Sequence, residues 1–251
     1  MERVPTGIYG LDELLGGGFL RGRNILVSGA TGTGKTIFGI QYLVNGALQE
    51  GEPGVYVAFD EQPEKIRQEM LNFGWNLAEL ERKGMFKFVD ASITRLGLLS
   101  EEKEAIEPGE IDFDAIVKQM LKAAVANDAR RAVIDSIPAL ALHLKDESEI
   151  RLAVFKLAVM AARSKLTTIM TSEVPEQSLA AGQPMQFSKY GVEEYVADGV
   201  ILLNYLGVGT QAARTMYIRK MRGTQHSEDI HPLEITKRGI VVKKVEELVS
   251  E

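Results

Sequence analysis

Cysteine is absent from the 251 residues of the chain, which excludes disulfide bonds and thiolate metal sites. Only three histidines are present, His143, His226 and His231, so a metal site built from several histidines is not expected. No apolar run approaches the roughly 18 residues that a membrane-spanning helix needs. Residues 1–23 also lack the apolar core and small-residue cleavage site of a secretory signal peptide. These absences predict a cytoplasmic protein without a membrane partner.

Positive charge is also in short supply, since 29 Lys and Arg stand against 35 Asp and Glu and give a net charge of −6. Proteins that coat nucleic acid usually carry a basic field, so the average charge disfavours that class, although a local basic groove stays compatible with it. The hydrophobic fraction of 45% is typical of a globular protein, and no repeat or linker divides the sequence. We expect one domain over residues 1–251.

Apolar runs of strand length alternate with helical patterns as far as residue 172. Strands are expected at residues 24–28, 55–59, 85–90, 131–135 and 167–172, and helices at residues 35–49, 113–126 and 149–164, with a further helix beginning at Pro63. Such alternation is typical of a mostly parallel sheet that is covered by helices on both faces. The sequence therefore predicts an α/β fold.

The pattern changes after Pro175. A polar segment with Gly and Pro covers residues 176–189, and apolar runs follow with no room for helices between them, at residues 199–205, 213–221, 232–236 and 239–245. Short strands joined by turns are typical of antiparallel hairpins, which we expect at one edge of the sheet. Earlier in the chain, residues 100–112 are expected to form an acidic, solvated loop.

The stretch GATGTGKT fits the pattern G-x-x-x-x-G-K-[ST] of a phosphate-binding P-loop, and it lies between an expected strand and an expected helix. Its members are Gly29, Ala30, Thr31, Gly32, Thr33, Gly34, Lys35 and Thr36. The glycines let successive backbone N–H groups face a polyphosphate. Lys35 would reach the β- and γ-phosphates, and the Thr36 hydroxyl would ligate Mg²⁺. A glycine-rich turn that only caps a helix is the alternative.

Asp135 ends the strand at residues 131–135, at the edge where open α/β sheets bind ligands. It is predicted to act with Thr36 on Mg²⁺, and its alternative role is to cap a turn. The sequence TSE at residues 171–173 ends another strand at the same edge. Contact with the γ-phosphate and a plain strand end are equally compatible with that sequence.

Asp60 and Glu61 directly follow the strand at residues 55–59, so they also belong to this edge. One of two adjacent carboxylates can orient or deprotonate the attacking water, and Glu61 is slightly preferred. The alternative for both is to cap the helix that begins near Pro63.

A cationic cluster, KMRGTQH, occupies residues 220–226, far from the P-loop in sequence. In a regular strand Met216, Ile218, Lys220 and Arg222 share one face. Two cations on one face need an anion, and a γ-phosphate bound by an adjacent subunit is one source, as for an arginine finger. A surface strand end with salt bridges is the alternative, and His226 is left without a role beyond a turn.

Several segments together resemble the KaiC-type domain of the RecA-like ATPases, over nearly the whole chain. The similar segments are PTGIYGLDELLGGGFLRGRNILVSGATGTGKT, FDEQPEKI, RRAVIDSI, YGVEEYVADGVILL and KMRGTQHSEDIHPLEIT. The resemblance implies a RecA-like P-loop core, with a mostly parallel twisted sheet between helices and antiparallel strands at its C-terminal edge. It also implies ATP or ADP with Mg²⁺ as cofactors.

The same resemblance implies a ring homo-oligomer, commonly a hexamer, that hydrolyses ATP slowly at subunit interfaces and has a regulatory or signalling output. Lys220 and Arg222 would then reach the phosphates of the neighbouring subunit, and the residues after the second strand, Asp60 and Glu61, would act on the water. A Ser-Thr pair is typical of the autokinase domain of the family. Because Glu194 and Tyr195 stand at that place, we do not expect self-phosphorylation.

Two other functions stay open. A RecA-type protein of DNA repair or recombination would bind nucleic acid, but residues 176–189 contain only one cation, Lys189, and one aromatic, Phe187. Binders of single strands usually combine a positive groove with several stacking rings, which disfavours this function. A nucleotide-gated scaffold that binds ATP without useful hydrolysis is the third function, and an unidentified protein partner is compatible with all of them.

Overall fold

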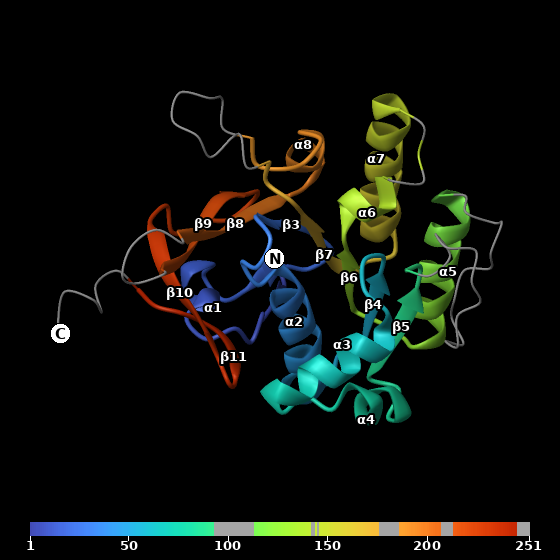
Figure 1. Cartoon of the computed structure of the whole chain (residues 1–251), viewed down its shortest axis with the longest axis horizontal. Coiled ribbons are helices and arrows are strands. Elements are labelled where there is room, and N and C mark those ends of the chain that lie inside the picture. Colours follow the sequence, from blue (N-terminus) through green and yellow to red (C-terminus); the bar gives the residue numbers. More distant parts are fainter. Residues whose placement is uncertain (93–112, 142–143, 145, 176–185, 207–212, 245–251) are drawn as a thin grey trace.

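A nine-stranded sheet forms the centre of the computed structural model, which describes residues 1–92, 113–141, 144, 146–175, 186–206 and 213–244. The strand order is β11-β10-β9-β8-β3-β7-β6-β4-β5, and helices lie on both faces (Figure 1). The expected acidic loop at residues 100–112 lies outside the described residues, as do residues 176–185 of the expected polar segment. None of the helices in the described ranges is long and apolar enough to span a membrane.

Six strands pair in parallel and form the part of the sheet that carries the P-loop. They are β3 (Asn24–Gly29), β4 (Gly54–Ala58), β5 (Phe86–Asp90), β6 (Arg131–Asp135), β7 (Thr167–Ser172) and β8 (Gly199–Leu206). Their register sets Ser28 level with Ser172 and Ala58 level with Asp135. Because the strands run in one direction, the P-loop and the carboxylates that follow the strands meet at one edge.

Three antiparallel strands extend the sheet beyond β8: β9 (Ala213–Met221), β10 (Ile230–Thr236) and β11 (Gly239–Val242). The expected antiparallel edge is therefore confirmed. The small pair β1 (Arg3–Val4) and β2 (Phe19–Leu20), which forms a separate sheet, was not expected from the sequence. Strands of two residues are too short for a periodic pattern, which explains the omission.

The helices divide between the two faces of the sheet, and each group has its own buried cluster. One group comprises α1 (Leu11–Leu14), α2 (Lys35–Gln49), α3 (Pro63–Met70), the 3₁₀ turn at Leu71–Phe73 and α4 (Leu77–Arg82). The other comprises α5 (Phe113–Ala126), α6 (Ile137–Ala141), α7 (Glu147–Arg163) and α8 (Glu193–Val196). Helix α7 begins two residues earlier than expected because the carboxylate of Asp146 accepts hydrogen bonds from Ser148 N and Glu149 N.

The side-chain alternation of β9 changes before Lys220. Met216 and Ile218 are fully buried on the face covered by α2, but a β-bulge opposite Val200 shifts the register. Lys220 pairs with Val200, which belongs to the core on the opposite face. The expectation that Lys220 and Arg222 continue the face of Met216 and Ile218 is therefore wrong, because a regular strand was assumed.

Two glycines let the P-loop helix α2 approach the sheet closely. A Cβ at Gly39 would lie 2.8 Å from Val133 Cγ1 of β6. At Gly46 a Cβ would collide with the guanidinium of Arg131, which is fully buried and ion-paired to Glu52 at 2.7 Å. The position of α2 thus depends on these two contacts. The position of the first helical residue after the P-loop depends on them as well.

Gly39→Ala tests the contact. Alanine normally stabilises a helix interior relative to glycine by about 1 kcal/mol. Here we expect a loss of about 1–3 kcal/mol in the free energy of unfolding, because the methyl group overpacks against Val133. Denaturant titration measures the change, with the exposed Gln49→Ala at the end of the same helix as a near-neutral control. A stabilised Gly39→Ala protein would contradict the close packing.

Candidate functional site

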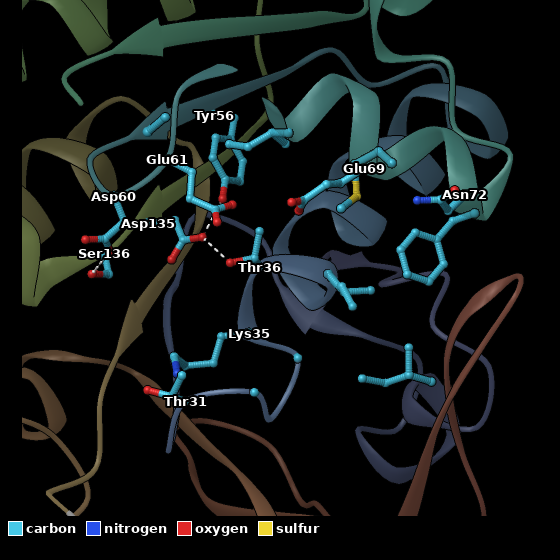
Figure 2. A pocket seen from close by; sticks show the side chains of 18 of the residues that line it. Thr31, Lys35, Thr36, Tyr56, Asp60, Glu61, Glu69, Asn72, Asp135 and Ser136 are labelled. Atoms are coloured by element: carbon cyan, nitrogen blue, oxygen red, sulfur yellow. Dashed lines mark hydrogen bonds between the residues drawn. The ribbon is translucent and has the colours of Figure 1, made fainter. Parts of the chain in front are cut away.

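A pocket of about 610 Å³ opens at the carboxyl edge of the parallel strands. The residues that line it come from the P-loop, from the ends of β4, β6 and β7, from α3 and from the antiparallel strands (Figure 2). The polar side chains among them are Thr31, Lys35, Thr36, Tyr56, Asp60, Glu61, Glu69, Asn72, Asp135, Ser136, Glu173 and Arg214. Most of the residues predicted to act at the P-loop edge line this pocket. Gly29, Ala30, Thr33, Thr171 and Ser172 do not line it.

The P-loop joins β3 to α2 and adopts backbone conformations that favour glycine. Gly32 and Gly34 have φ angles of 79° and 105°. Gly29 passes so close to the carbonyl of Leu203 that any Cβ would collide with it. Thr33 closes the loop from inside, since its Oγ1 donates to Ala30 O at 2.8 Å. The loop therefore turns tightly around its own N–H groups, as a polyphosphate cradle requires.

Lys35 folds back over the P-loop, where its Nζ donates to Gly29 O at 2.8 Å and to Ala30 O at 3.0 Å. Burial lowers the pKa of Lys35, and the nearby carboxylates of Asp135 and Glu173 oppose that shift. The ammonium group is thus held between the loop and the carboxylates. A phosphate of a bound nucleotide is an anion of the kind that this cation would accept.

Asp135 is held by three hydroxyl groups from three different elements. Thr36 Oγ1 at the start of α2 donates to Asp135 Oδ2 at 2.8 Å. The hydroxyls of Tyr56 on β4 and Thr171 on β7 donate to Oδ2 and Oδ1, respectively. Burial and the charge of Asp135 raise the pKa of Tyr56 well above its usual value, so this phenol stays protonated and remains a donor.

The oxygen atoms of Thr36 and Asp135 suit Mg²⁺. This ion is usually bound through one or two carboxylates together with substrate phosphates and water, and not by a complete protein cage. Among the described residues no group of three or more His, Cys, Asp or Glu side chains is arranged to hold a metal ion. One hydroxyl and one carboxylate beside a phosphate-binding loop therefore fit a nucleotide-bound Mg²⁺ better than an independent metal centre.

Asp60 and Glu61 lie on the rim of the pocket on the same side as Asp135 (Figure 2). Ser136 Oγ donates to Asp60 Oδ2 at 2.6 Å, while Glu61 is partly exposed and ion-paired with Lys65 at 2.7 Å. The N-cap position of α3 belongs to Gln62, and it makes no side-chain capping bond. Glu61 makes no capping bond to α3 among the described residues, while the capping alternative for Asp60 and the roles of the two carboxylates in water activation stay predictions.

The other end of the pocket is largely apolar, with Glu69 and Asn72 as its polar members (Figure 2). Ile37, Met70, Phe73 and Ile235 line it, and the Phe73 ring stacks on Trp75 with ring centroids 5.0 Å apart. A planar base suits such a surface, because ligand sites combine apolar walls with a few polar groups. The pocket thus has a polar end that fits phosphates and an apolar end that fits a base. These apolar residues were not identified from the sequence, where they appear as ordinary core positions.

Arg214 at the start of β9 was also missed. Its guanidinium lies over the Tyr205 ring, with 4.4 Å from Cζ to the ring centroid, and it donates to Gly32 O at 3.4 Å. It is thus a second cation beside the P-loop, supplied by the same chain. An arginine within an expected strand gave no hint of this, because the pairing of β9 with β8 brings it to the P-loop edge.

Lys220 and Arg222 are not part of this pocket, because β9 runs antiparallel to β8. Arg222 N donates to Asp198 O, and Asp198 N donates to Asn24 O at the first residue of β3. Gly29 lies five residues further along β3, which corresponds to about 16 Å at 3.3 Å per residue. The two cations therefore lie toward the opposite edge of the sheet, and they do not reach the P-loop of their own chain.

The fold and the pocket define a P-loop nucleotide-binding protein with a RecA-like core, since a strand, a phosphate-binding loop and a helix meet a hydroxyl–carboxylate pair at the edge of a parallel sheet. A family model described as the KaiC ATPase matches residues 4–247. The chain belongs to this family, which confirms the resemblance seen in the sequence. The chain therefore has a KaiC-like ATPase domain.

Several proteins share this domain. The chain is similar to a UPF0273 protein of Aeropyrum pernix, with 38% identity over 96% of this chain and 94% of that protein. It is similar to the circadian clock oscillator protein KaiC of Synechococcus elongatus, with 37% identity over 96% of this chain but 44% of that protein. The chain thus spans about half the length of such clock proteins. The crystal structure of a KaiC-like protein from Pyrococcus horikoshii is similar at a TM-score of 0.82 and 37% identity, covering 97% of this chain and 99% of that one.

Tyr56→Phe tests the hydroxyl clamp on Asp135. The substitution removes one donor without changing the ring, so we expect the Mg²⁺ concentration for half-maximal binding of a fluorescent ATP analogue to rise by about tenfold. Tyr42→Phe is a matched control, because its buried hydroxyl donates to Thr167 O at 3.2 Å, away from the pocket. Each variant should lose about 1 kcal/mol of stability. Equal Mg²⁺ dependence in both variants would contradict the role of Tyr56.

Proposed function

We propose that this chain hydrolyses ATP at the interfaces of a homo-oligomeric ring, most simply a hexamer, and that the ATP cycle serves a regulatory or signalling purpose in the cytoplasm. Within each subunit of the ring, residues 1–251 act as a single KaiC-like domain. The observation that carries the proposal is the separation of two functional groups. One edge of the sheet carries the nucleotide pocket, and two cations that suit a phosphate lie toward the opposite edge.

The nucleotide is held by the P-loop at its phosphates and by the apolar end of the pocket at its base. Lys35 exchanges its bonds to the loop carbonyls for bonds to the β- and γ-phosphates. Thr36 and Asp135 hold Mg²⁺, which supplies charge neutralisation at the phosphates when it is bound. Arg214, in contact with the loop at Gly32, adds a second cation from the same chain.

Glu61 orients the attacking water and takes up its proton, and Asp60 assists from the position that Ser136 fixes. The ion pair of Glu61 with Lys65 lies at the surface, where ion pairs are weak and easily exchanged. Glu61 can therefore turn from Lys65 toward a water molecule beside the γ-phosphate at little cost.

Charge builds up on the γ-phosphate oxygens during transfer, and a cation from outside the chain stabilises it best when water is excluded. In a head-to-tail ring the Lys220 edge of one subunit faces the pocket edge of the next, because the two edges are opposite sides of one sheet. Lys220 and Arg222 then act in trans. Two relatives that match this chain are named as circadian clock proteins. Their names support a regulatory output of the ATP cycle here.

Nucleic-acid binding has no support from the described residues of the segment after β7. The guanidinium of Arg219 covers the Phe187 ring at 5.2 Å, and Lys189 lies 4.0 Å from the carboxylate of Glu173. Neither a free stacking ring nor an isolated cation is therefore presented by residues 186–189, which disfavours a strand-binding function.

Lys220→Ala and Glu61→Gln test the proposal together. Each variant alone should hydrolyse ATP at least about tenfold more slowly than the wild type, because one lacks the trans cation and the other the water-orienting carboxylate. A 1:1 mixture should recover roughly a quarter of the wild-type rate, since that share of interfaces combines an intact pocket with an intact cation. Phosphate release measures the rates.

Lys122→Ala on the exposed face of α5 is the matched control for charge loss, and its turnover should be unchanged. Arg222→Ala should behave as Lys220→Ala does. A mixture whose rate is only the average of the two variants would rule out action in trans.

A further inference from the structure

Helix α8 is the element that holds the two cations. Lys220 Nζ donates to Glu194 O at 2.9 Å and to Ala197 O at 2.6 Å, and the Arg222 guanidinium donates to Tyr195 O at 3.4 Å. The last carbonyl groups of a helix have no intrahelical donors, so they are available acceptors. The place of both cations therefore depends on the place of this single helical turn.

The C-terminal end of α8 is fixed at the amino end of β3. Asp198 follows the helix, and its carboxylate accepts from Arg23 Nη1 at 2.9 Å and from Asn24 N at 3.1 Å. Its backbone N donates to Asn24 O. These bonds fix the chain beyond α8 to the sheet, at the edge opposite the P-loop.

The N-terminal end of α8 is fixed by a buried carboxylate. Glu193 has no exposed surface, and its oxygens accept from Ser172 Oγ at 3.0 Å and from Tyr190 N at 3.3 Å. A carboxylate is rarely buried to this extent, because its desolvation is costly unless donors satisfy it. Neither the P-loop motif nor the cationic cluster gives Glu193 a role.

Ser172 connects Glu193 to the nucleotide pocket, because it is one of three consecutive residues at the end of β7. Thr171 points to one face and donates to Asp135, while Ser172 points to the other face and donates to Glu193. Glu173 follows directly and lines the pocket. The end of β7 thus contacts the predicted magnesium ligand, the pocket and helix α8 within three residues.

We propose that Glu193 is a positioning residue that ties helix α8 to the end of β7, and that it thereby sets where Lys220 and Arg222 are presented to the neighbouring subunit. This inference rests on the proposed action of the two cations in trans. It adds a structural link within one subunit. The end of β7 supports both the nucleotide pocket and, through α8, the cations that the subunit offers to its neighbour.

Because Glu193 positions cations that act on the neighbouring subunit, its loss is expected to slow ATP hydrolysis in the neighbour's pocket. Glu193→Ala leaves the donors of Ser172 and Tyr190 unsatisfied, so α8 loses its fixed place. We expect turnover to fall by about tenfold or more, as displacement of a catalytic group by an ångström does. Glu193→Gln keeps an oxygen acceptor of the same reach and should stay within about twofold of the wild type. Retention of secondary structure by circular dichroism checks that each variant is folded.

Mixing experiments on the full chain separate positioning from a local or structural role. Glu193→Ala mixed 1:1 with Glu61→Gln should recover roughly a quarter of the wild-type rate of phosphate release, because the pocket of the first variant is intact and the cations of the second are intact. Ser172→Ala should show a smaller defect that recovers in the same mixture. Ser188→Ala is its matched control, since this serine is equally buried and its hydroxyl has no hydrogen-bond partner among the described residues.

The outcomes distinguish the inference from the proposed function. If the Lys220→Ala mixture recovers and the Glu193→Ala mixture does not, Glu193 acts on its own pocket and the inference is overturned. If neither mixture recovers, action in trans fails and the inference fails with it. A Glu193→Gln protein as slow as Glu193→Ala would also overturn the inference. The negative charge of Glu193, and not only an oxygen acceptor at that place, would then be required.

Discussion

The parallel register of β3, β7, β6 and β4 is the constraint on which the rest of the structure depends. It sets the ends of these strands level, so that the P-loop, Asp135 and the loop with Asp60 and Glu61 come together although long stretches of sequence separate them. The bond between Thr36 and Asp135 then closes the site across two elements. A change of register by one residue in β6 would turn Asp135 to the other face of the sheet, away from Thr36.

The same sheet is the basis of the proposal that a second copy of the chain completes the site. Strand β9 runs antiparallel to β8, and this reversal sends Arg214 toward the P-loop and Lys220 toward the opposite edge. A subunit therefore has a phosphate pocket at one edge of its sheet and, toward the other, two cations that donate to the carbonyl groups of α8. Head-to-tail contact between copies would bring the cations of one subunit to the pocket of the next. The proposed ring is therefore argued from the direction of the strands more than from any single residue.

Much of this could be predicted from the sequence, because the signals were local. The P-loop glycines, the strand that ends in Asp135 and the periodic helices at residues 35–49 and 113–126 each lie within one continuous segment. The missed features depend on pairing between distant segments. The bulge before Lys220, the donors on Tyr56 and Thr171, and the carbonyl groups of α8 are set by tertiary contacts that no local pattern encodes.

If catalysis needs a second copy of the chain, the mass of the protein in solution has to show that copy. Light scattering behind size-exclusion chromatography, with and without ATP and Mg²⁺, measures that mass at a fixed protein concentration. The account predicts a closed oligomer, about six times the mass of the 27.6 kDa chain, when the nucleotide is present. A strict monomer under both conditions, with ATP still hydrolysed, would contradict it.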